Sequence, residues 1–271
     1  MLCSYARGYT TALDHNGHRG RTGGAGVTLR ISVIVCAHNE ARYLPACLHS
    51  LLAQSRLPDE ILVIDNASTD ATRAVAQQIP NVRVVGEPRK GLVVAREAGR
   101  HAASGDLLVY LDADCRAPLM WLERVERRFL RAAGLIALSG PYRFYDWDWW
   151  GRLLIGAYDV TLAPATQLLV KRLLRLGTIF YGGNFAVRRE ALDRIGGFDT
   201  SIEFHGEDTN LGRRLFAIGD VALCRDCYLY TSARRYVAMG KGAVVRLYVR
   251  NFVSEILHHR PKDTSHVDVR A

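Results

Sequence analysis

Apolar and polar residues alternate in regular blocks along the first part of this chain. Short runs of Val, Ile and Leu are each followed by polar residues, and the stretches between them carry apolar side chains at helical spacing. The pattern predicts strands at 31–36, 61–64, 82–85 and 107–111, and helices from about 44, over 71–79 and over 92–103. Because the strands are apolar on both faces, helices should cover both sides of a mostly parallel sheet. We therefore predict a doubly wound α/β fold.

The chain after Gly140 lacks this alternation and is built differently. Before this region, Pro118 is predicted to open a helix, because its φ is fixed and it has no N–H to satisfy. The later landmarks are a tryptophan cluster (Trp147, Trp149, Trp150), an apolar stretch (153–176), a glycine turn (Gly182, Gly183) and a compact helix (207–218). We expect a helical region here that extends the α/β domain.

The apolar stretch from 153 to 170 raises the question of a membrane. It contains Asp159 and Pro164 and is short for crossing a bilayer, so a spanning helix is rejected. Lys171, Arg172 and Arg175 follow it and tryptophans precede it, which suits a helix lying among lipid headgroups. Packing of the same residues onto the sheet is the competing interpretation and is favoured.

The charge of the chain points to anionic partners. Lys and Arg number 36 against 27 acidic residues, a net charge of +9, and the segment from Arg225 to the end is especially basic. Diphosphates, nucleic acid and lipid headgroups all fit, but no nucleic-acid-binding motif is present, so no specific nucleic acid is expected.

The cysteines and the N-terminus bear on the compartment. Six scattered cysteines do not form a secreted disulfide framework, which favours a reducing cytosol. Cys224 and Cys227 have the spacing of half a zinc site, but nothing in the sequence completes it. Residues 1–29 lack the apolar core of a signal peptide and are interpreted as a disordered leader. We expect a cytoplasmic protein, either free or peripheral at the inner face of the membrane.

The clearest candidate chemistry is the pair Asp112 and Asp114. The two residues follow a predicted apolar strand, at the carboxyl edge of the sheet where open α/β sheets bind ligands. Carboxylates one residue apart can direct oxygens toward a hard divalent cation that also binds phosphate. A solvated loop with two Asp residues is the ordinary alternative. Asp65 to Asp70 likewise follows a strand, where Ser68 or Thr69 can cap the next helix.

The order of these motifs resembles the family 2 glycosyltransferases of GT-A fold over about three quarters of the chain. The matching segments lie at 32–40, 64–70, 91–96, 103–114, 182–190, 195–199 and 206–215. The resemblance implies a GT-A domain over 30–235, with a nucleotide-sugar half (30–116) and an acceptor half (117–235). Residues 236–271 would form a basic C-terminal helical tail.

The resemblance also implies roles for particular residues. Asp112 and Asp114 would hold Mg²⁺ or Mn²⁺ on the donor diphosphate, with Asp114 as the more direct ligand. Asp208 would be the general base, oriented by Glu207. The nucleotide-sugar would be bound by Cys36, His38, Glu40, Asp65, Asn66, Arg96, Asp112 and Arg235. Many relatives carry Asp where this chain has Asn66, so the donor base stays open, with UDP favoured.

The predicted function is therefore inverting transfer of a sugar from a nucleoside-diphosphate sugar to a hydroxyl acceptor, such as an envelope glycan, a glycolipid or a lipid-linked saccharide. A nucleotidyltransferase is an alternative, but it should show an early basic glycine-rich loop, where this chain has Asn39 and Glu40. An inactive sugar-nucleotide or anionic-surface binding module is the other alternative. Intact Asp112, Asp114 and Asp208 argue against that one.

Overall fold

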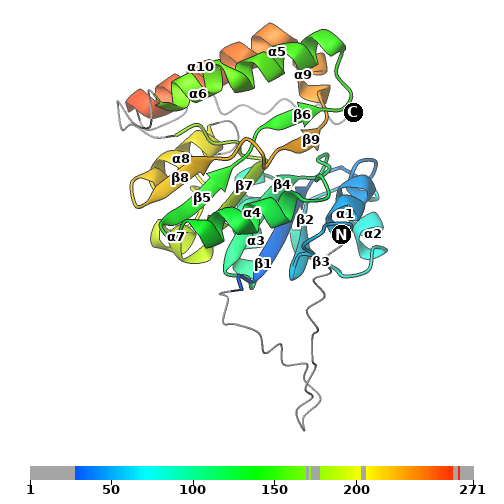
Figure 1. The fold of residues 1–271 in the computed structure, drawn as a ribbon. Coiled ribbons are helices and arrows are strands. Elements are labelled where there is room, and N and C mark those ends of the chain that lie inside the picture. The colour runs from blue at the N-terminus through cyan, green and yellow to red at the C-terminus, as the bar shows by residue number, and fades with distance from the viewer. Residues whose placement is uncertain (1–27, 169–170, 172–177, 203–205, 259–261, 263–271) are drawn as a thin grey trace, which may run out of the picture.

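The structure is a computed structural model that describes residues 28–168, 171, 178–202, 206–258 and 262 (Figure 1). The predicted leader lies outside the described residues except for its last two positions. Arg172 and Arg175, which entered the headgroup interpretation, also lie outside them. The domain boundaries inferred from the resemblance stay predictions.

A seven-stranded sheet forms the centre of the molecule, in the order β3-β2-β1-β4-β7-β5-β8. The strands are β1 (Ile31–Ala37), β2 (Glu60–Asn66), β3 (Val82–Glu87), β4 (Leu107–Asp112), β5 (Leu135–Ser139), β7 (Asn184–Arg188) and β8 (Asp220–Leu223). The first four strands pair in parallel, and β7 runs antiparallel to both β4 and β5. The predicted, mostly parallel α/β sheet is thus confirmed.

Helices cover both faces of the sheet, as the two-sided apolar strands predict (Figure 1). They are α1 (Leu44–Leu52), α2 (Thr72–Gln77), α3 (Leu92–Ala102), α4 (Trp121–Arg131), α7 (Arg189–Arg194) and α8 (Glu207–Phe216). One core cluster joins the sheet to side chains such as Leu48 of α1 and Trp121 of α4. The other joins it to Val93 of α3 and Leu215 of α8. Each sheet face therefore has its own core.

Two details of the helix starts differ from the sequence prediction. Pro118 does not open α4, because the helix begins at Trp121, whose N–H donates to the Pro118 carbonyl over 2.8 Å in a preceding turn. Neither Ser68 nor Thr69 caps α2. The Asp70 carboxylate accepts the Thr72 N–H over 2.9 Å, while the Ser68 hydroxyl accepts the N–H of Asn39 from the neighbouring loop.

A second layer lies over one end of the sheet (Figure 1). It consists of the parallel strand pair β6 (Tyr142–Phe144) and β9 (Leu229–Thr231), and of the helices α5 (Trp149–Val160), α6 (Leu162–Gln167), α9 (Arg234–Met239) and α10 (Lys241–His258). Salt bridges and hydrogen bonds tie it to the sheet domain, among them the contact of Glu255 in α10 with Arg213 in α8 at 3.1 Å.

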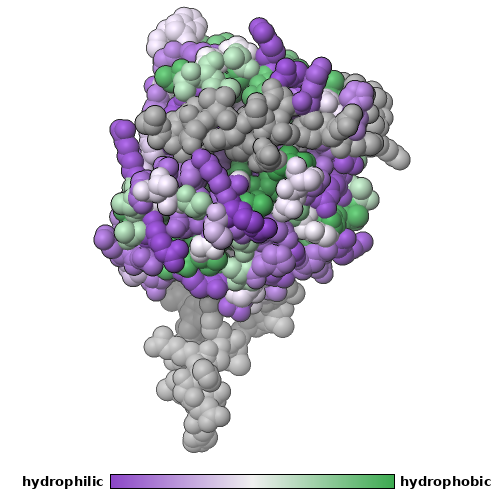
Figure 2. All heavy atoms as spheres, turned by 180° about the vertical axis from the view of Figure 1, so that it is seen from behind, coloured by the Kyte–Doolittle hydropathy of each residue, from purple (hydrophilic) through white to green (hydrophobic). Residues whose placement is uncertain are grey.

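The favoured prediction that the tryptophan cluster and the apolar stretch pack onto the sheet is wrong for most of these residues. Trp147 does pack, against Phe144 and Tyr236 with ring centroids 4.8 Å away. Trp149 and Trp150 stack on each other instead and remain 60% and 56% exposed. Apolar residues of this layer reach the surface (Figure 2 shows one face) because the helices rest only on their narrow inner side. Among the described residues, no helix is both long and apolar enough to cross a bilayer.

Candidate active site

The strand register brings the predicted site residues to one edge of the sheet. Cys36 on β1 is the partner of both Ile64 on β2 and Asp112 on β4, and Ala37 is the partner of Asp65. Parallel strands end at the same edge, so residues far apart in sequence become neighbours there. Burial raises the pKa of the Cys36 thiol to about 12, despite the lowering effect of Arg96, so the thiol stays protonated at neutral pH.

Asn66 holds the loops at this edge through both ends of its amide. Its Nδ2 donates to the carbonyls of Glu87 and Arg89, at 3.2 and 2.6 Å, and its Oδ1 accepts the N–H of Gly91 over 2.8 Å. The ring of His38 in turn contacts the Asn66 carbonyl over 2.7 Å. Both ends of the Asn66 amide are therefore engaged in hydrogen bonds within the protein. The structure therefore shows Asn66 positioning these loops, and its predicted place near the base stays a prediction.

Asp65 is buried beside Asn66. Its carboxylate accepts the N–H of Ser68 at 3.3 Å and lies 3.6 Å from Arg73. Because Arg73 is half exposed, this ion pair is weakened by solvent. Asp65 thus lines this edge of the sheet, with a partner that is itself half exposed to solvent.

Asp114 lies in a buried cluster of charges at the end of β4. The guanidinium of Arg234 is 3.0 Å from Asp114 and also donates to both carboxylate oxygens of Glu40. Burial raises the pKa of Asp114 to about 6; Arg234 lowers it, and the Asp112 and Glu40 carboxylates raise it further. Negative charge at this point is costly without a cation, and Arg234 supplies one.

The sequence predicted Arg235 for the phosphate site, although the adjacent Arg234 is the residue that reaches the carboxylates. Arg235 donates to the Tyr248 hydroxyl over 3.0 Å. Burial lowers the pKa of Arg235, but Tyr248, Asp112 and Glu207 together raise it above its usual value. Two consecutive arginines at the start of α9 point in different directions. Arg234 contacts Asp114 and Glu40, whereas Arg235 contacts Tyr248.

A Gly182-Gly183 turn lies between two of the predicted functional carboxylates. A Cβ atom on Gly183 would lie 1.9 Å from Oδ2 of Asp112, and one on Gly182 would lie 2.9 Å from Cβ of Asp208. Only glycine permits both carboxylates to approach the backbone here. The turn therefore brings Asp112, from the end of β4, and Asp208, from the start of α8, to the same place.

Arg96 links the two halves of the site from α3. It is almost fully buried, donates to the Gly182 carbonyl over 2.7 Å and lies 3.3 Å from Glu207. Burial and the neighbouring Glu207 carboxylate raise the pKa of Asp208 to about 7, while backbone hydrogen bonds and the positive charge of Arg96 oppose the shift. A carboxylate with such a pKa can take up a proton near neutral pH.

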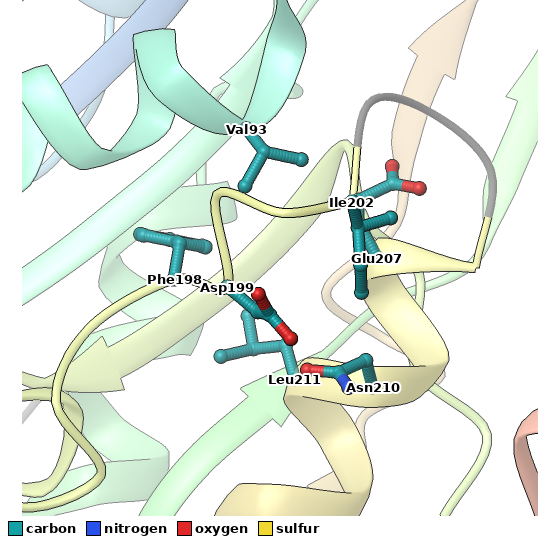
Figure 3. A pocket seen from close by; sticks show the side chains of 7 residues that line it. All are labelled: Val93, Phe198, Asp199, Ile202, Glu207, Asn210 and Leu211. Carbon is teal, nitrogen blue, oxygen red and sulfur yellow. The ribbon is translucent and has the colours of Figure 1, made fainter. Parts of the chain in front are cut away.

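Glu207 also lines a small hollow on the other side of α8 (Figure 3). Val93, Phe198 and Ile202 supply its apolar wall, and Asp199 and Asn210 its polar part. Glu207 is the one predicted site residue among those that line the hollow, which include neither Asp208 nor Asp112. The hollow does not include the residues predicted to bind a nucleotide.

Cys224 and Cys227 form a separate buried pair with sulfur atoms 2.7 Å apart. Within the described part of the chain, Asp226 is the one further metal-ligating side chain close to both. Asp226 already pairs with Arg128 at 2.7 Å. The structure thus groups Cys224, Cys227 and Asp226, and the interpretation of the two cysteines as structural stays a prediction.

The comparisons with known proteins agree with this fold. The family described as Glycosyl transferase family 2 matches residues 32–196, and the chain belongs to that family. It is 25% identical to Glycosyltransferase AglE of Haloferax volcanii, over 79% of this chain and 73% of that protein. It is 28% identical to a putative polypeptide N-acetylgalactosaminyltransferase 9 of Drosophila melanogaster, over 70% of this chain but only 33% of that protein.

Two solved structures share the fold. The mannosyltransferase PcManGT of Pyrobaculum calidifontis, solved with GDP-Man and Mn²⁺, matches with a TM-score of 0.61 and 22% identity over 85% of this chain and 63% of its own. Glucosyl-3-phosphoglycerate synthase of Mycobacterium tuberculosis, solved with Mn²⁺, UDP and phosphoglyceric acid, matches with a TM-score of 0.59 and 23% identity over 84% of this chain and 79% of its own. The fold is GT-A, and the chain is a family 2 glycosyltransferase.

Proposed function

We propose that the chain is a metal-dependent, inverting glycosyltransferase that uses a nucleoside-diphosphate sugar, with UDP as the favoured nucleotide. The observation that carries this proposal is the meeting of Asp112 and Asp208 at the Gly182-Gly183 turn. A site for the leaving diphosphate and a base for the acceptor would then lie on either side of one reacting carbon.

The donor set at the end of β4 fits a divalent cation. Asp112 and Asp114 offer hard carboxylate oxygens, and the raised pKa of Asp114 reflects an excess of buried negative charge that a cation relieves. When bound, Mg²⁺ or Mn²⁺ would stabilise negative charge on the diphosphate. The presence of Mn²⁺ in the two related structures supports this choice.

Asp208 is the proposed general base. Its pKa of about 7 leaves a substantial fraction ionised at neutral pH and still makes the carboxylate basic enough to accept a proton from a hydroxyl. Glu207, held by Arg96, would keep Asp208 in place. Attack from the Asp208 side, opposite the diphosphate, would invert the anomeric carbon without a covalent intermediate.

The residues at the ends of β1 and β2 are the proposed nucleoside pocket. Cys36, His38 and Glu40 would line it, Asp65 would face the base, and Asn66 would fix the surrounding loops. Arg96 would act through Gly182 and Glu207 rather than by direct contact. For the diphosphate we add Arg234 to the predicted Arg235, because Arg234 already lies against Asp114.

The proposed acceptor is a hydroxyl group of an envelope glycan, a glycolipid or a lipid-linked saccharide, and the proposed place of action is the cytoplasm or the inner face of the membrane. Related proteins act on different acceptors, as the names of PcManGT and glucosyl-3-phosphoglycerate synthase indicate. Membership in the family therefore does not select the acceptor.

The test is a thermal-shift panel of UDP, GDP, dTDP and CDP, each with Mn²⁺ and with a chelator. A ligand that binds the native state raises its melting temperature. We expect a Mn²⁺-dependent shift with UDP that disappears in Asp114→Asn and persists in Asp208→Asn. Loss of the shift in both variants would contradict the separate roles. A shift without any sugar transfer or donor hydrolysis would favour the inactive binding module.

A further inference from the structure

The helix α10 exposes three valines and buries the polar side chains of Asn251 and Glu255. Its outward side carries Val245, Val249 and Val253, spaced four residues apart and each about half exposed. Its inward side carries Asn251 and Glu255, which are almost completely buried. A helix at the surface of a water-soluble domain has the opposite arrangement. The outward stripe of α10 is therefore suited to an apolar environment.

Partners in the sheet domain hold one carboxylate oxygen of the buried Glu255, so the inward side of α10 is anchored. Glu255 accepts from Nδ2 of Asn210 and lies 3.1 Å from the guanidinium of Arg213, both on α8. These contacts fix which side of α10 faces inward. The valine stripe is consequently fixed on the outside.

The neighbouring helix α5 shows the same feature. Trp149, Trp150, Leu153 and Leu154 lie on one side of its first turns and are 55–64% exposed. Lys241, the first residue of α10, forms an ion pair of 2.9 Å with Asp148, the N-cap of α5. The contact places the starts of the two helices side by side, as Figure 1 also shows. Their apolar residues therefore belong to one layer.

The charges of this helical layer indicate what kind of surface it can bind. In the described parts of α5, α6, α9 and α10, the exposed Arg and Lys residues are Arg152, Lys241, Arg246 and Arg250, whereas the acidic Asp159 and Glu255 are not exposed. Lys241 is paired with the exposed Asp148, so Arg152, Arg246 and Arg250 carry the net positive charge. Two copies meeting through this layer would bring like charges together. An anionic lipid surface complements the basic residues and accepts the tryptophans and valines at its headgroup boundary.

We infer that α5 and α10 form a docking surface for an anionic bilayer, with the helices lying in the interface rather than crossing it. The docking surface itself is independent of the proposed function, but the kind of acceptor that we infer from it rests on that function. The layer is connected to the candidate site, since Arg235 of α9 contacts Tyr248 of α10 and Arg234 contacts Asp114. A docked enzyme would hold its acceptor site next to the lipid, which favours a lipid-anchored acceptor over a free glycan.

The experiment is flotation of the full chain with vesicles of phosphatidylcholine alone, and of phosphatidylcholine with about one third phosphatidylglycerol. We expect binding to the anionic vesicles only, weakened when NaCl is raised from about 0.1 M to about 0.5 M. The triple variant Val245→Ser, Val249→Ser, Val253→Ser should bind about tenfold more weakly. Leu57→Ser is the matched control, because Leu57 is equally exposed on the sheet domain and should bind as the native protein does.

A second variant, Arg152→Glu with Arg246→Glu, tests the charge without altering the apolar stripe and should also lose about tenfold in binding. The inference is overturned if the native protein does not float, or if it floats equally well with both altered proteins. It is also overturned if the native protein is a dimer that dissociates in the valine variant. The Mn²⁺-dependent shift with UDP is measured on the same samples. If the shift persists without flotation, the membrane inference fails alone; flotation without a shift leaves the docking surface and removes the proposed function.

Discussion

At the scale of single residues, the site depends on where negative charge is tolerated. Burial raises the pKa of both Asp114 and Asp208, and the two differ in the charges that surround them. Asp114 has Asp112 and Glu40 as neighbours and Arg234 as a compensating cation. Asp208 has Glu207 as its neighbour, and Arg96 is shared with that residue. One carboxylate is thus prepared for a cation and the other for a proton.

Asp208 provides a prediction about stability and pH. Its pKa in the folded protein is about 7, above the ordinary value of 3.8, so the folded protein binds an additional proton between these values. Stability is therefore lost as the pH rises through this window. Asp208→Asn cannot ionise and should melt several degrees higher than the native protein at about pH 8, with little difference at about pH 4.

The same pKa predicts the pH dependence of the reaction. Sugar transfer should rise with pH through about 7, because the base must be ionised. Asp208→Asn should lose at least about a hundredfold in the rate of transfer. A rate that is independent of pH across this range, or a variant with the native rate, would show that another group takes the proton.

Gly183 provides a second prediction at this scale. A Cβ atom would collide with Oδ2 of Asp112 at 1.9 Å, so Gly183→Ala must displace that carboxylate. We expect the Mn²⁺-dependent shift with nucleotide to fall strongly in this variant. Gly134→Ala is the control, since nothing lies within 4 Å of its Cβ position. Equal shifts in the two variants would mean that Asp112 does not contribute to the metal site.

At the scale of elements, the short helix α9 completes a site that is otherwise built on the sheet. Arg234, at its first position, connects Glu40 after β1 with Asp114 after β4. The carboxylates follow predicted strands, so the sequence located them. The cation is Arg234, which lies 120 residues after Asp114, and no local sequence pattern predicts its contact with that residue.

Arg234 should act as the cation of this cluster when no metal is present. Arg234→Ala leaves the buried carboxylates of Glu40 and Asp114 without it and should lower the free energy of unfolding by about 3 kcal/mol in the presence of a chelator. Mn²⁺ should restore more stability to this variant than to the native protein. Urea unfolding with and without Mn²⁺ measures both quantities, and an equal gain in the two proteins would contradict this role.

At the scale of the whole molecule, a parallel sheet domain carries a helical layer next to its ligand-binding edge. Polar contacts join the layer to the domain, among them the buried contact of Glu255 with Asn210 and Arg213. Breaking a buried ion pair leaves an uncompensated charge and costs more than the pair itself is worth. The attachment of the layer should therefore depend on these residues.

Arg213→Ala should lower the free energy of unfolding by about 3 kcal/mol, because Glu255 stays buried with Asn210 alone. The double variant with Glu255→Ala should lose less than the sum of the two single losses, which reports a direct coupling. Strict additivity in a double-mutant cycle would show that this pair does not hold the layer in place.

The sequence by itself determined the parallel α/β domain, the carboxylates at its strand ends and the acidic start of α8. These features follow from local rules: apolar runs specify strands, and polar residues after them fall at the ligand-binding edge. Only the tertiary structure decided that Asn66 is used by its own loops, that Arg234 rather than Arg235 reaches Asp114, and that the tryptophans and valines of the helical layer face outward. Each of these depends on which side of an element meets a distant partner, and the order of residues along the chain does not contain that information.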